Sequence, residues 1–149
     1  MRVFIVVILV ALAATVALPQ GAGAQSGLAA AKTQLTTAIF HSGELAQRGN
    51  AVAASKTHLQ HTMNCLEGNK GPNFNPAPGH PCQGQGNGVI PDLQAAQAAG
   101  VAGAGRALLF TNAAHTLILT ALQSNDVNLV QPYALVISNQ LKQAMAALP

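Results

Sequence analysis

The chain has 149 residues, of which 50% are hydrophobic and only 7% are charged, with a formal net charge of +3. A surface that binds nucleic acid needs clustered cations and stacking aromatic side chains. Here the cations are scattered along the chain and aromatic residues make up 3% of it, so the sequence argues against a nucleic-acid partner.

The N-terminal segment is typical of a secretory signal peptide. Arg2 supplies a positive charge, residues 3–18 form an apolar run, and residues 22–24 (Ala-Gly-Ala) fit an A-x-A cleavage site. The run is shorter than the ~20 apolar residues of a membrane-spanning helix. We therefore expect residues 1–24 to be removed. The mature protein would be a single domain, residues 25–149, without a membrane span, and would be periplasmic or secreted.

The mature chain is rich in Ala and Leu, and its turn-forming residues predict four helices. Their expected ranges are 27–48, 51–67, 92–123 and 127–148, the last beginning either at Val127 or near Pro132. Glycines at 100, 103 and 105 weaken the first half of the third helix, where we expect a kink or break. Apolar residues at alternating three- and four-residue spacings predict an all-α, up-down four-helix bundle.

A long loop, residues 68–91, separates the second and third predicted helices and is rich in Gly, Pro, Asn and Gln. Loops of this length are uncommon in compact domains unless they are functional or disordered. The chain has two cysteines, Cys65 and Cys82. An even number of cysteines in an exported protein favours a disulfide, which here would tether the loop. A thiolate metal ligand at Cys65 is the less favoured alternative, because it requires a reduced cysteine. His80 is expected to be an exposed loop residue.

The predicted helices carry four candidate metal ligands, which are His41, His58, His61 and His115. At about 100° per residue, His58 and His61 share one face of the second helix. Gln60, Asn64 and Glu67 fall on its polar face. The histidines therefore belong to the side of this helix that faces the bundle.

Residue counts from the turns place three histidines at one height in an up-down bundle. His41 and His58 lie eight to nine residues on either side of the turn at 49–50, and His115 lies ten residues before Asn125. With a rise of about 1.5 Å per residue, the three heights agree within roughly 3 Å. Such a layer of neutral imidazoles suits Cu, Zn or Ni. The alternative is that each ring is a core residue bonded to a carbonyl or to water.

Two stretches, AIFHSGELAQRGN (residues 38–50) and KTHLQHTMNCLEG (residues 56–68), resemble the histidine-bearing helical hairpins of small bacterial periplasmic metal-binding proteins. They are also similar to uncharacterised exported bacterial proteins with paired histidines before NCL. The resemblance implies ligand roles for His41, His58 and His61. Histidines recur along every helix in the metal-binding group, whereas this chain has five in all, so a capacity for many ions is not implied.

The sequence favours a non-enzymatic function. It contains no G-x-S-x-G, H-E-x-x-H or C-x-x-C-H motif and only four carboxylate side chains. The favoured hypothesis is an exported protein that binds a transition-metal ion, Cu, Zn or Ni, through its histidine layer. The alternative is a metal-free, disulfide-linked helical interaction protein whose long loop contacts another exported protein. A metalloenzyme with an open coordination position is a weaker third hypothesis.

Overall fold

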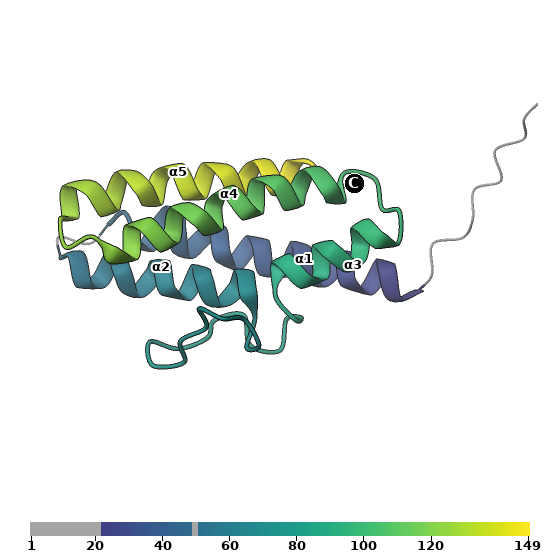
Figure 1. Ribbon diagram of the computed structural model, residues 1–149, viewed down its shortest axis with the longest axis horizontal. Coiled ribbons are helices and arrows are strands. Elements are labelled where there is room, and N and C mark those ends of the chain that lie inside the picture. Colours follow the sequence, from purple (N-terminus) through teal and green to yellow (C-terminus); the bar gives the residue numbers. More distant parts are fainter. Residues whose placement is uncertain (1–21, 49–50) are drawn as a thin grey trace, which may run out of the picture.

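The computed structural model describes residues 22–48 and 51–149, and this part of the chain is helical without any β-strand (Figure 1). Its elements in chain order are α1 (Ala22–Phe40), the π-helical segment η1 (His41–Leu45), α2 (Val52–Glu67), α3 (Val89–Ala98), α4 (Ala104–Gln123) and α5 (Val127–Ala146). The all-α prediction is confirmed. Most of the predicted signal peptide, residues 1–21, lies outside the described residues. Within the described residues, no helix combines the length and the hydrophobicity of a membrane-spanning segment.

The described residues form five α-helices where the sequence predicted four. The segment predicted as one helix over 92–123 is divided, because α3 ends at Ala98 and α4 begins at Ala104. Gly100 and Gly103 have φ values of 75° and 79°, which a right-handed helix does not accommodate. A Cβ at Gly103 would also collide with a backbone carbonyl beyond the end of α5. The expected break is therefore complete, and α3 is a separate short helix packed against α1 and α4.

The four longer helices lie side by side, with neighbours in the chain running in opposite directions (Figure 1). α1 packs against α2 and α5, and α4 packs against the same two helices. Alanines fill much of the interior, so the helices approach closely and few large side chains are needed. The largest apolar side chains that are fully buried include Leu35, Leu59, Met63, Ile118, Ile137 and Leu141. The core thus lies between all four long helices.

The connection between α2 and α3 spans residues 68–88 and is three residues shorter than predicted, because α3 begins at Val89. The predicted disulfide is present, and Cys65 and Cys82 are both buried. Closing a loop with a sequence separation of 17 stabilises the fold by about 3 kcal/mol in the chain-entropy model. The disulfide joins the middle of the loop to the last turn of α2, so the loop folds back along that helix (Figure 1).

Candidate metal site

The first histidine of the site lies where α1 changes its winding. The N–H of Ala46 donates to the carbonyl oxygen of His41 at 2.9 Å, a five-residue spacing that widens the helix into η1. Such π-helical turns occur often at functional sites. Gly43 permits this segment to lie against α5, since a Cβ there would come within 2.7 Å of the Ser138 hydroxyl. η1 therefore combines a local change of winding with a close helix contact, and His41 is its first residue.

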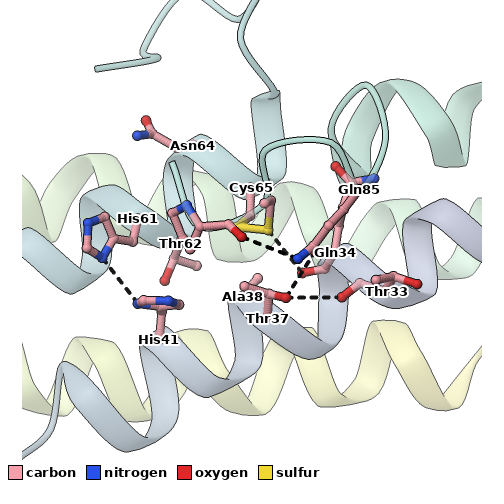
Figure 2. The surroundings of a disulfide bond; sticks show 12 residues. Thr33, Gln34, Thr37, Ala38, His41, His61, Thr62, Asn64, Cys65 and Gln85 are labelled. Carbon is pink, nitrogen blue, oxygen red and sulfur yellow. Dashed lines mark hydrogen bonds between the residues drawn. A yellow bond between two sulfur atoms is a disulfide. The ribbon is translucent and has the colours of Figure 1, made fainter. Parts of the chain in front are cut away.

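Three imidazoles meet between η1 and α2. His41 Nδ1 lies 3.3 Å from His58 Nδ1 and 3.2 Å from His61 Nδ1, and Figure 2 shows the His41–His61 contact beside the disulfide. One ligand atom from each ring lies within 4.8 Å of the other two. A tetrahedral ion with metal–nitrogen bonds of 2.0–2.1 Å has nitrogen–nitrogen edges of about 3.3–3.4 Å. Two of the three pairs therefore already have close to the spacing of ligands on one ion.

The loop fixes which nitrogen of His61 carries the proton. His61 Nε2 lies 2.7 Å from the carbonyl oxygen of Pro78. Because a carbonyl only accepts, Nε2–H is the donor, and in the neutral ring the lone pair is on Nδ1, the atom closest to His41. Metal-binding histidines commonly donate their second ring nitrogen to a carbonyl or carboxylate in this way, which sets their orientation.

The polar face of α2 holds the loop that supplies this carbonyl. Asn64 is fully buried, and its Nδ2 donates to the carbonyls of Asn75 and Gly79 at 2.7 Å each. Its Oδ1 accepts the N–H of Asn75 at 3.0 Å. Gln60 Nε2 adds a bond to the carbonyl of Asn73 at 2.9 Å. The loop residues on either side of Pro78 are thus bonded to the helix that carries two of the histidines.

Burial, followed by the neighbouring charges of His61 and His58, lowers the pKa of His41 from 6.5 to about 4. Burial and His61 also lower the pKa of His58. Both rings are therefore neutral at pH 7, and the neutral imidazole is the form that ligates a metal. Both are also half-buried, so solvent still reaches the cluster.

His115 lies elsewhere in the structure. Its Nε2–H donates to Glu67 Oε1 at 2.6 Å, and it is not part of the histidine group, which within the described residues consists of His41, His58 and His61. The structure therefore brings together three of the four predicted ligands and places the fourth in a pair with a carboxylate.

The height argument for His115 assumed that both interhelical turns lie at the same level. Instead, the bond between His115 and Glu67 places the middle of α4 beside the last turn of α2, and Lys56 Nζ reaches Asn125 Oδ1 at 3.4 Å from inside α2. His115 lies ten residues before Asn125, and Glu67 lies eleven residues after Lys56. In antiparallel helices with equal rise those two residues are level. The α4–α5 turn is therefore offset along the bundle from the turn before α2, and His115 lies beside Glu67 instead of beside His58 and His61.

Two further expectations need correction. His80 is half-buried rather than exposed, its ring meets Phe74 edge-on, and its buried Nδ1 has no hydrogen-bond partner. The polar face of α2, with Gln60, Asn64 and Glu67, was expected to face solvent, but it binds the loop. The sequence did contain a signal for this contact. Hydrogen-bonding side chains at positions 60, 64 and 67 lie just before a long loop, and a cysteine in that loop was expected to pair with a cysteine of the same helix. The role of the Pro78 carbonyl has no side-chain signal in the sequence.

Comparisons of the chain with protein-family models, with curated proteins and with solved structures return no match. The function of the site is therefore inferred from its geometry. The resemblance to periplasmic metal-binding proteins stays a prediction.

The stability of the metal-free protein should fall as the pH is lowered from about 6.5 towards 4. In that interval the unfolded chain protonates His41, whereas the folded chain keeps it neutral because its pKa is about 4. The unfolded state binds more protons, so stability that is fully present above pH 6.5 is lost on acidification. Thermal melts of chelator-treated protein between pH 7.5 and 4.5 test this. The His41→Gln variant should show a flatter dependence, and parallel curves for the two proteins would contradict the assignment.

Proposed function

We propose that the protein binds one transition-metal ion through the Nδ1 atoms of His41, His58 and His61. The observation that carries the proposal is the pair of Nδ1–Nδ1 contacts at 3.2 and 3.3 Å. The bond between His61 Nε2–H and the Pro78 carbonyl supports it, because it sets the tautomer needed for ligation through Nδ1. An all-imidazole donor set suits Zn, Cu or Ni better than the hard cations Mg²⁺ and Ca²⁺, which prefer oxygen ligands.

The site fits a protein that takes up and releases its ion. Three protein nitrogens leave one position of a tetrahedral ion to water or to another donor. The half-buried rings keep a route to solvent open. We therefore infer that the protein stores, buffers or delivers the ion, a role that its lack of catalytic sequence motifs also favours. The alternative of a loop that serves to contact a partner has less support, because much of residues 73–79 is engaged by α2.

Export of the protein is part of the proposal and rests on the signal-like segment at residues 1–24. Expression of the full chain in a bacterium, followed by N-terminal sequencing of the protein in the periplasmic fraction, tests it. We expect the recovered protein to begin at Gln25. Recovery of the uncleaved chain from the cytoplasm alone would contradict export but would leave the metal site untouched.

Isothermal titration of the metal-free protein with Zn(II), Cu(II) and Ni(II) tests metal binding. We expect one ion per chain and a loss of affinity of at least about 100-fold in His58→Ala and in His61→Ala, larger than the 10- to 100-fold typical of outer-shell changes. His115→Ala is the matched control and should bind like the wild type. Equal losses in all three variants, or none in any, would contradict the three-histidine site.

The loop should contribute to affinity without providing a ligand. Asn64→Ala removes the bonds that hold the loop at Asn75 and Gly79, and so loosens the Pro78 carbonyl that orients His61. We expect about tenfold weaker binding at unchanged stoichiometry, the lower end of outer-shell effects. Asn69→Ala, an exposed loop position, is the control. Unchanged affinity in a folded Asn64 variant would show that the loop plays no part in the site.

A further inference from the structure

A cavity of about 510 Å³ lies between the C-terminal end of α2, the start of α3 and the middle of α4. Its volume is within the range of small-molecule sites, which are mainly apolar with a few polar groups. Pro72, Ile90 and Pro91 provide apolar lining. Glu67, His115 and Lys70 provide the ionisable groups. None of these residues belongs to the histidine cluster, so the cavity is a separate candidate site.

The walls of this cavity are built by two close approaches within the loop. Gly68 has a φ of 70°, and a Cβ there would lie 1.9 Å from the carbonyl oxygen of Asn87. A Cβ at Gly71 would collide with the side chain of Glu67. Asn87 is held in turn by Asp92, which accepts its N–H at 3.1 Å and its Nδ2 at 2.9 Å. Both ends of the loop are thus fixed, and a preformed cavity binds a ligand at a lower ordering cost.

The carboxylate of Glu67 is already satisfied within the protein. Its Oε2 accepts the N–H of Asn73 at 2.6 Å, and its Oε1 accepts Asn73 Nδ2 at 2.7 Å and His115 Nε2 at 2.6 Å. Burial raises the pKa of Glu67, but these hydrogen bonds outweigh it, so the pKa lies below its usual value. The group is therefore an anion at neutral pH whose charge is offset by three donors. It orients His115 and has little capacity left for a ligand.

Lys70 is the charged group of the lining that has no ion-pair or hydrogen-bond partner in the described part of the chain. Lys70 is exposed, so it lies at the solvent side of the cavity, whereas the Glu67–His115 pair is satisfied within the protein. We propose that the cavity binds a small organic carboxylate with an apolar body. The body lies against Ile90 and the two prolines, and the carboxylate pairs with Lys70.

A titration followed by amide ¹H–¹⁵N NMR spectra of the metal-free protein tests this with three probes that share a phenylalkyl body and end in an anionic, a neutral and a cationic group. They are 4-phenylbutyrate, 4-phenylbutanamide and 4-phenylbutylamine. We expect 4-phenylbutyrate to shift the amide signals of Gly71, Asn87 and Ile90 in a saturable manner. It should bind about two- to fivefold more tightly than the neutral amide, which is the scale of an exposed ion pair, and the amine should bind most weakly.

Two variants separate recognition of charge from filling of the cavity. Lys70→Ala should reduce the affinity for 4-phenylbutyrate to that for the amide, whereas Lys142→Ala, an exposed lysine on α5, should leave it unchanged. Ile90→Trp should block all three probes while the far-UV circular dichroism stays that of the wild type. Because Lys70 is exposed, its variant remains informative if the tryptophan variant misfolds. Signals that shift outside this cavity, equal affinities for the three probes, or an unaffected Lys70 variant would each overturn the proposal.

Discussion

The side-chain amide of Asn64 is fully buried and uses both its nitrogen and its oxygen to hold the segment that follows α2. A segment of this length with so many glycines would otherwise have a large conformational entropy. The hydrogen bonds of this amide and the neighbouring disulfide fix the loop at Asn75, Gly79 and Cys82. Pro78 is thereby placed against His61. The histidine cluster depends on this attachment, whereas the two ends of the loop are held beside the Glu67–His115 pair by Asp92 and by the close approaches at Gly68 and Gly71.

The histidine cluster poses an electrostatic problem that a bound cation would solve. With the proton of His61 on Nε2, its Nδ1 is an acceptor that faces His41 Nδ1. His41 Nδ1 also lies 3.3 Å from His58 Nδ1, and it carries at most one proton. At most one of the two short contacts is therefore a full hydrogen bond in the neutral, metal-free cluster. A structural role would be served better by rings bonded to carbonyls or water, whereas a metal ion accepts all three lone pairs at once.

The sequence predicted well what depends on local pattern. Gly68 ends α2 at the expected residue, the two cysteines pair, and the level of His41 with His58 follows from counting across a short turn. It predicted less well what depends on how separate helices are offset. His115 was misplaced because the middle of α4 lies beside the last turn of α2, and nothing local in the sequence encodes that offset. Asn64 was assigned to a solvent-facing side because its spacing reports only which face it occupies, not what covers that face.

Histidine side-chain NMR shows directly whether the Nδ1 atoms of His41, His58 and His61 share one ion. Long-range ¹H–¹⁵N spectra distinguish the two ring nitrogens of each histidine before and after one equivalent of Zn(II). We expect the Nδ1 signals of His41, His58 and His61 to shift together, His61 Nε2 to stay protonated, and His80 and His115 to be unchanged. A shift at Nε2, or a response at His80 or His115 in place of the three, would contradict it.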